Sequence, residues 1–195
     1  MINNTLCGVV LAGGKSSRFG SDKALSMLNG KTFLENQILL LTKYCSEVFI
    51  SGDKKEYDFL QIPKIKDLIQ DKGPIGGIFS CLINSNYQYN LFIPCDMPLI
   101  DDDLVRKLVD GIEPGKVCCF SSNKEPLIPF PLIMPTCCVD VIKQNIVDEL
   151  LDLKSNIESI GFKNIMIDVS DLICLKNINK KDQYIELFDD GILQG

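Results

Sequence analysis

The chain has 195 residues and a formal net charge of −6, and this length suffices to bury most of the unfolded chain's apolar surface in a single domain. The negative charge argues against nucleic acid as a partner, because binding to a phosphate backbone draws on an excess of Lys and Arg. No apolar run approaches about 20 residues and the N-terminus lacks a secretory pattern, so we expect a cytoplasmic protein that binds no membrane.

The first predicted strand leads into a glycine-rich, basic loop. Residues 6–12 form an apolar run without a polar face, which is typical of a central parallel strand. Gly13-Gly14 follows, and glycine lets main-chain N–H groups approach an anion without a Cβ in the way. Lys15, Arg18 and Lys23 then supply positive charge. This density of cations favours a nucleoside triphosphate site over the alternative, a tight strand-to-helix turn with solvated surface cations.

Two familiar phosphate-binding motifs do not fit this loop. A P-loop that ends in Gly14-Lys15-Ser16 needs a glycine five positions before Gly14, and Val9 stands there. A dinucleotide fingerprint needs Gly-x-Gly-x-x-Gly, whereas the glycines at 13, 14 and 20 are spaced differently. Neither motif accounts for the loop.

Helices and strands are predicted to alternate along the rest of the chain. Thr32 and Glu35 have capping-box spacing and begin a helix of about 12 residues. The apolar pattern predicts a second helix that buries Ile75, Ile78, Phe79, Leu82 and Ile83. The other predicted elements are strands over 47–51, 90–94, 117–120 and 165–169, helices from Asp101, over roughly 139–153 and from near Asn179, and a proline-rich stretch over 126–135. This order predicts an α/β fold, a single three-layer domain with a mostly parallel sheet.

Asp96 is the candidate metal ligand. It follows the apolar run 91–94 and therefore stands at the carboxyl end of a predicted inner strand, where open α/β sheets bind ligands. Magnesium prefers one or two carboxylates together with phosphate oxygens and waters. The alternative is a capping aspartate between two prolines, and the upstream phosphate loop favours the metal role.

The nine cysteines and the run Asp101–Asp103 also invite a metal interpretation. There is no Cys-x-x-Cys and no histidine, so the usual zinc spacings are missing. We expect free cysteines that serve mostly as small buried apolar residues. The three aspartates are expected to stabilise a helix N-terminus rather than to bind a metal.

Several motifs together resemble those of the molybdenum cofactor guanylyltransferases, a family of nucleotidyltransferases with a Rossmann-like fold. The main motif is Leu-Ala-Gly-Gly-x-Ser-x-Arg-x-Gly-x-Asp-Lys over residues 11–23. The further motifs are Asn29-Gly30-Lys31, Asp67 before Gly73-Pro74-Ile75-Gly76-Gly77, Pro94-Cys95-Asp96-Met97-Pro98, and Asn177-Ile178-Asn179. The resemblance covers nearly the whole chain, and implies a nucleotide-binding part over about 1–100 and an acceptor-binding part over about 101–195.

The resemblance implies a reaction and its partners. GMP would pass from GTP to the phosphate of molybdopterin or Mo-molybdopterin, with Mg²⁺ as cofactor, giving molybdopterin guanine dinucleotide and pyrophosphate. Molybdoenzyme chaperones or cofactor-delivery proteins are further implied partners. Such a transfer needs no general base, because an acceptor phosphate is already an anionic nucleophile and metal and cations stabilise the leaving pyrophosphate. The absence of histidine is compatible with this chemistry.

The resemblance also implies the site residues. The implied nucleotide-binding residues are Leu11, Ala12, Gly13, Gly14, Lys23, Ser51, Asp67 and Asp96, of which Asp96 also binds the metal. The implied catalytic residues are Lys15, Arg18, Lys23 and Asp96, and Lys15 and Arg18 would neutralise the β and γ phosphates. Asp67 would accept hydrogen bonds from guanine, although a surface aspartate at a strand end is the alternative. Asn177 and Asn179 are implied acceptor contacts, and Asn179 suits a helix cap equally well.

The chain departs from the family pattern at two positions. Ser51 stands where the family typically has Asn, and Glu125-Pro126-Leu127 replaces a segment with a basic or His residue before the proline. A cytidylyl- or other nucleotidyltransferase acting on a small phosphorylated acceptor therefore stays open. So does a non-catalytic GTP-binding module that switches a partner, although it would not need Asp96 together with three loop cations.

Overall fold

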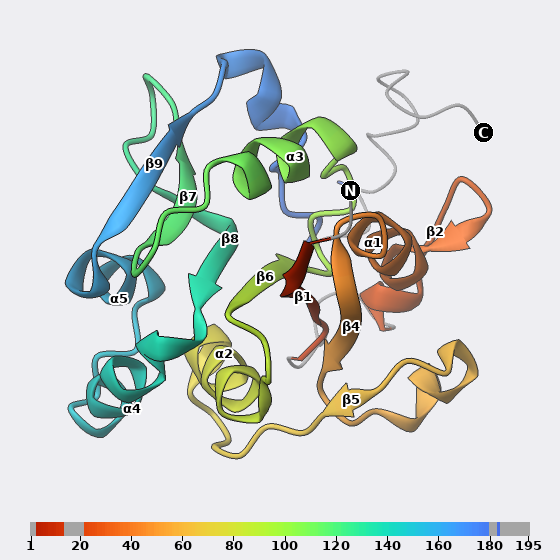
Figure 1. Ribbon diagram of the computed structural model, residues 1–195. Coiled ribbons are helices and arrows are strands. Elements are labelled where there is room, and N and C mark those ends of the chain that lie inside the picture. The colour runs from red at the N-terminus through yellow and green to blue at the C-terminus, as the bar shows by residue number, and fades with distance from the viewer. Residues whose placement is uncertain (1–2, 14–21, 180–182, 184–195) are drawn as a thin grey trace.

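The computed structural model describes residues 3–13, 22–179 and 183 and contains a seven-stranded sheet of order β5-β4-β1-β6-β8-β7-β9 (Figure 1). The strands of this sheet are β1 Asn3–Leu11, β4 Cys45–Ser51, β5 Lys64–Ile65, β6 Tyr89–Pro94, β7 Val117–Ser121, β8 Ile128–Pro135 and β9 Phe162–Met166. A separate pair is formed by β2 Met27–Leu28 and β3 Lys31–Thr32. Every strand of the large sheet runs parallel to β1 except β8, so the predicted mostly parallel sheet is confirmed.

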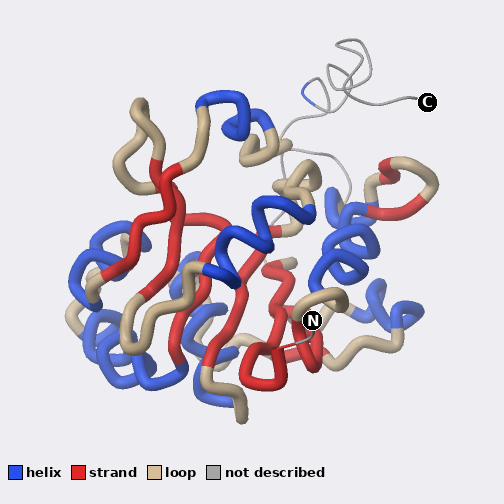
Figure 2. The backbone as a smooth tube through the Cα atoms, turned by 45° about the horizontal axis from the view of Figure 1, so that its top comes forward, coloured by secondary structure: helices blue, strands red, loops and turns tan. Residues whose placement is uncertain are grey.

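Helices cover both faces of this sheet (Figures 1 and 2). The α-helices are α1 Phe33–Leu41, α2 Gly73–Asn84, α3 Asp102–Asp110, α4 Val139–Val147 and α5 Leu153–Ile160. α1 and α3 contribute to one cluster of buried apolar side chains, and α2, α4 and α5 contribute to a second cluster. The two clusters lie on opposite faces of the sheet, which confirms the predicted three-layer α/β architecture.

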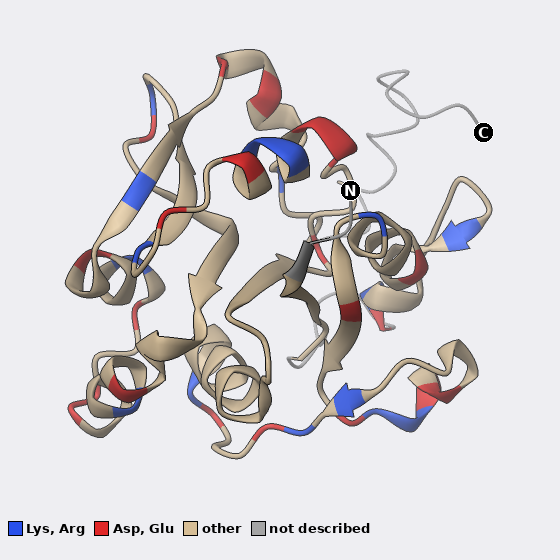
Figure 3. Ribbon diagram, in the orientation of Figure 1, with Lys and Arg blue, Asp and Glu red and all other residues tan. Residues whose placement is uncertain are grey.

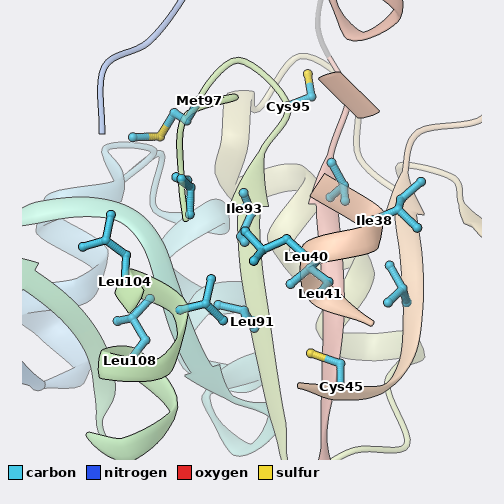
Figure 4. Packing of buried hydrophobic residues seen from close by; sticks show 14 of the residues in the cluster. Ile38, Leu40, Leu41, Cys45, Leu91, Ile93, Cys95, Met97, Leu104 and Leu108 are labelled. Carbon is cyan, nitrogen blue, oxygen red and sulfur yellow. The ribbon is translucent and has the colours of Figure 1, made fainter. Parts of the chain in front are cut away.

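The first cluster forms where α1 packs on β1 and β4 and α3 packs on β7 and β8. α1 begins at the predicted capping box, because the Glu35 amide donates to Thr32 Oγ1 at 3.1 Å and Glu35 Oε2 accepts from the Thr32 amide at 2.7 Å. Leu41 of α1 is fully buried near Leu91 and Ile93 of β6 (Figure 4). Burying one such side chain contributes about 1.5–3 kcal/mol. This packing fixes the strand that leads to Asp96.

The proline-rich stretch forms β8, a strand that the sequence did not predict. β8 pairs antiparallel with β6, opposing Ile133 to Leu91, and with β7, opposing Ile133 to Cys118. Proline cannot donate a ladder hydrogen bond, so prolines argue against a central strand. The prolines at 129 and 131 lie beyond the paired positions of β6, next to an irregularity in the pairing with β7.

The helix predicted over 139–153 is α4, which begins at Val139 as predicted but ends at Val147, and a second helix, α5, begins at Leu153. α4 ends at Val147, Glu149 adopts a left-handed φ of 60°, and the Leu150 amide donates to the Asn145 carbonyl at 2.8 Å. Asp152 then caps α5 by accepting from the Ser155 amide at 2.8 Å. The cap at Asp152 is a local signal that could have revealed the second helix.

Two smaller predictions also need correction. The strand predicted over 165–169 is β9 and covers 162–166. Its first residues include the exposed polar Lys163 and Asn164, so the apolar pattern did not indicate where the strand begins. Ile83 is 52% exposed, so its predicted place on the buried face of α2 is wrong, while the other four predicted residues are buried.

The structure confirms that most cysteines are small buried residues and that the run Asp101–Asp103 begins a helix. All nine cysteines are free and seven of them are buried, although Cys137 is exposed and Cys174 is half-buried. Asp101 caps α3 by accepting from the Leu104 amide at 3.0 Å. Within residues 3–13, 22–179 and 183, no group of three His, Cys, Asp or Glu side chains could hold a metal ion. The described helices also include none with the length and apolar character needed to cross a membrane.

Candidate active site

The carboxyl ends of β4, β1 and β6 lie side by side, because Leu11 is in register with Ser51 on one side and with Pro94 on the other. From β1 the chain proceeds to β4 and β5, and then returns to β6 on the other side of β1. Ligands of open α/β sheets bind at such a switch in strand order. A cleft of about 1120 Å³ lies here, lined by residues that include Leu11, Gly13, Lys23, Ser51, Asp67, Gly77, Asp96, Glu125, Phe130, Lys154 and Asn177.

Asp67, Ser51 and Gly77 form one wall of the cleft. Asp67 Oδ1 is buried and has no hydrogen-bond partner in the described part of the chain. Burial raises the pKa of the Asp67 carboxyl, the Ser51 side chain lowers it, and the negative charge of Asp53 raises it further. An unpartnered buried acceptor costs free energy unless a ligand supplies a donor. This wall therefore suits a ligand with N–H groups.

Gly77 leaves room beside these polar groups. A Cβ at Gly77 would lie 3.0 Å from Ser51 Oγ and 3.6 Å from Asp67 Oδ1. Glycines inside a helix often mark such close approaches.

We expect Gly77→Ala to retain the fold and to weaken nucleotide binding ~10-fold. The added methyl group would displace the Ser51 hydroxyl and reduce the space in the cleft beside Asp67. Titration of GTP followed by calorimetry measures the affinity, and a melting curve checks the fold. Wild-type affinity in a folded variant would show that this wall does not contact the nucleotide.

Lys23 and Asp96 both line the cleft and form an ion pair there. Lys23 Nζ donates to Asp96 Oδ2 at 2.8 Å and to Asn179 Oδ1 at 2.8 Å. The side chains of Lys23 and Asp96 are 17% and 19% exposed, so water screens this ion pair only in part. One ammonium group thus links the loop after β6 to the C-terminal segment.

Backbone hydrogen bonds fix the loop that carries Asp96. The Cys95 amide donates to the Leu11 carbonyl at 3.1 Å, and the Ile178 amide donates to the Asp96 carbonyl at 2.7 Å. From α1, Gln37 Nε2 donates to the Met97 carbonyl at 2.7 Å. The loop that carries the Asp96 carboxylate is therefore hydrogen-bonded to β1, to α1 and to the C-terminal segment.

Glu125, Phe130 and Lys154 line the opposite wall of the cleft. Lys154 Nζ and Glu125 Oε1 form an ion pair at 3.2 Å, with both side chains nearly half exposed. Phe130 and Lys154 belong to none of the motifs that predicted site residues. Phe130 lies in β8, a strand that was not predicted. Lys154 lies in the first turn of α5, a helix that was also not predicted.

The structure brings most of the predicted site residues together. Leu11, Gly13, Lys23, Ser51, Asp67, Asp96 and Asn177 line the cleft. Ala12 is buried, and Asn179 reaches the site through its hydrogen bond with Lys23. Gly14, Lys15 and Arg18 lie outside the described residues. The individual roles of these residues stay predictions.

Charged residues are distributed unevenly over the strands of the sheet (Figure 3). The strands β1, β6 and β8 carry no charged residue, and the charged residues that line the cleft stand on loops and helices. Asp96 supplies one carboxylate at the centre. A single carboxylate fits a magnesium ion whose remaining ligands are substrate phosphates and waters, and does not fit a metal enclosed by protein ligands alone.

Comparison with known families decides the identity of the fold. A family model described as the MobA-like NTP transferase domain matches residues 8–157. The chain belongs to this family. Nucleotidyl transfer is accordingly the chemistry of the enzyme. The matched region contains the strands β4 to β8 in full and the second part of β1.

Individual relatives agree with this assignment. A probable molybdenum cofactor guanylyltransferase of Flavobacterium johnsoniae is 33% identical over 186 residues, which cover 94% of this chain and 96% of the relative. A molybdenum cofactor guanylyltransferase of Desulfosudis oleivorans is 25% identical over 187 residues, or 92% and 93% of the two chains. Among solved MobA-like folds, molybdopterin-guanine dinucleotide biosynthesis protein A of Archaeoglobus fulgidus superposes with a TM-score of 0.73 over 95% of this chain and 98% of that one, at 21% identity.

Proposed function

We propose that the enzyme transfers GMP from GTP to the phosphate of molybdopterin, with or without bound molybdenum, and releases pyrophosphate. The observation that carries this proposal is the unpartnered Asp67 Oδ1 in the same cleft as the Lys23–Asp96 pair. The Asp67 carboxylate can accept hydrogen bonds from a base. The Lys23–Asp96 pair can bind the phosphates of a triphosphate and their metal ion. The names of the relatives support the guanylyl branch.

Asp67 accounts for the choice of base. Guanine presents two adjacent donors, N1–H and the exocyclic amine, and a carboxylate can accept from both. Adenine presents an acceptor at N1 and would leave one carboxylate oxygen unpaired. Leaving a buried polar group unpaired is how sites reject an analogue strongly. The raised pKa of Asp67 agrees with a carboxylate that has lost solvent and awaits such donors.

The transfer itself requires positioning and charge. An oxygen of the acceptor phosphate forms the new bond to the α-phosphorus of GTP, the bond from that phosphorus to the bridging oxygen breaks, and pyrophosphate leaves with the electron pair. Lys23 contacts the nucleotide phosphates and Asp96 holds the magnesium ion, while Lys15 and Arg18 neutralise the β and γ phosphates. The magnesium ion, when bound, supplies further charge stabilisation at the phosphates. Asn177 and Asn179 contact the acceptor.

Pyrophosphate release tests this function. We expect release with GTP and molybdopterin in the presence of magnesium, and at least ~100-fold less with ATP, the scale on which a hydrogen-bonding site rejects an unsuitable analogue. Release with CTP instead would favour a cytidylyltransferase. Binding of GTP without release, with every phosphorylated pterin offered, would favour a non-catalytic binding module.

A further inference from the structure

Tyr57 does not line the cleft but contacts Ala12 and Asp22, near the two ends of the glycine-rich signature 11–23. It belongs to a short 3-10 helix, Lys55–Leu60, that follows β4, and its side chain is fully buried. Its hydroxyl donates to Asp22 Oδ2 at 2.8 Å and lies 3.5 Å from the carbonyl of Ala12. A phenol has one proton, so the short contact with the carboxylate is the stronger one. Ala12 precedes the glycines of the signature, and Asp22 directly precedes Lys23.

Asp22 in turn shapes the turn that carries Lys23. Asp22 Oδ1 accepts from the Ala24 amide at 3.2 Å and the Asp22 carbonyl accepts from the Leu25 amide at 3.0 Å, which closes the 3-10 turn Lys23–Leu25. Ala24 is 1% exposed and anchors this turn in the core. The Lys23 side chain leaves the turn in the other direction and reaches Asp96.

Lys54 completes the support of Asp22. Its ammonium group lies 2.7 Å from Asp22 Oδ2 and 5.6 Å from the centre of the Tyr57 ring. Burial alone raises the pKa of the Asp22 carboxyl, but the hydrogen bonds from Lys54 and Tyr57 outweigh burial and hold the pKa below its usual range. Asp22 is therefore charged, and its two carboxylate oxygens have different partners. Oδ2 accepts from Tyr57 and Lys54, and Oδ1 accepts from the Ala24 amide of the turn.

We propose that Tyr57 and Lys54 are positioning residues for nucleotidyl transfer, which act by fixing Asp22 and, through the turn at 23–25, the ammonium group of Lys23 at Asp96. Neither residue lines the cleft. The effect on turnover rests on the proposed function. The fixing of the turn at 23–25 rests on the contacts of Tyr57, Lys54 and Asp22 alone.

The test compares Tyr57→Phe with Tyr87→Phe. The Tyr87 hydroxyl also donates to a carboxylate, Glu47 Oε2 at 3.1 Å, but it lies next to the amino ends of the strands and lines no part of the cleft. Both changes remove one phenolic hydroxyl and keep the ring. The readouts are the melting temperature, the hydrogen exchange of the Ala24 and Leu25 amides, and kcat and KM for GTP. Lys54→Met, measured in the same way, removes the second support.

We expect Tyr57→Phe to lower kcat ~10-fold, the scale of a lost hydrogen bond to a charged group, while KM changes ~3-fold or less. The Ala24 and Leu25 amides should exchange faster in Tyr57→Phe and in Lys54→Met, and not in Tyr87→Phe. Unchanged exchange and unchanged kcat in Tyr57→Phe would overturn the proposal, and so would an equal loss of kcat in Tyr87→Phe. If the wild-type enzyme releases no pyrophosphate, the proposed function fails, and the exchange of the two amides still decides whether Tyr57 fixes the turn.

Discussion

Asp96→Asn is expected to fold normally and to lower magnesium-dependent turnover by a factor of ~100 or more. The amide keeps the size of the side chain but removes the charge that pairs with Lys23 and that a magnesium ion requires. Backbone hydrogen bonds to Leu11 and Ile178 hold the loop around position 96, so the side-chain change should not disturb it. Pyrophosphate release over a range of magnesium concentrations measures the effect.

Asp103→Asn is the matched control for this prediction. Asp103 is an exposed aspartate of α3 that pairs with Lys107 at 2.8 Å, outside the cleft. Its replacement should leave turnover unchanged. Wild-type turnover in Asp96→Asn would remove Asp96 from the mechanism. A loss of the same size in Lys23→Met and in the double variant would show that Asp96 acts only through Lys23, since effects of two groups that act as a unit do not add.

Asp67→Asn is expected to weaken GTP binding by ~10- to 100-fold and to reduce the discrimination against ATP. The amide places a donor where guanine requires an acceptor, and the buried position gives the mismatched groups no access to water. Calorimetric titration with GTP and with ATP measures both affinities. Unchanged affinity for both nucleotides would assign Asp67 a purely structural role at a strand end.

The same residue predicts a pH dependence. Because the pKa of Asp67 is raised, the carboxylate takes up its proton at a higher pH than an ordinary aspartate. GTP should therefore bind with full affinity above this pKa, and the affinity should fall as the pH decreases through it. The reason is that the protonated Asp67 carboxyl accepts fewer hydrogen bonds than the carboxylate. Asp67→Asn, which cannot titrate, should lack this loss.

The nucleotide side of the fold was largely predictable from the sequence. The strand before the loop, the capping box at Thr32 and the strand that leads to Asp96 each leave a local signal, and the structure confirms all three elements. The contact between Lys23 and Asp96 could be anticipated only through the family resemblance, because 73 residues separate them and no local pattern records the pairing.

The far wall of the cleft was less predictable. The prolines of β8 argue against a central strand, and only the neighbouring strands β6 and β7 make that arrangement possible. Tyr57 was missed for a related reason, because it stands among charged residues in a segment with no apolar period. Its role depends on Asp22, and the sequence does not show that the two residues meet.

The place of β8 in the sheet constrains how the molecule can be divided. The chain up to Pro94 contains the strands β5, β4, β1 and β6, and the far edge of β6 receives its hydrogen-bond partner only from β8, at residues 132–135. β6 is uncharged, mostly apolar and almost completely buried. A fragment that ends before β8 would leave this edge unpaired, and such an edge is a template for association with other chains. The two sides of the cleft serve different substrates in the proposed reaction, yet we expect the chain up to Pro94 not to fold as an autonomous unit.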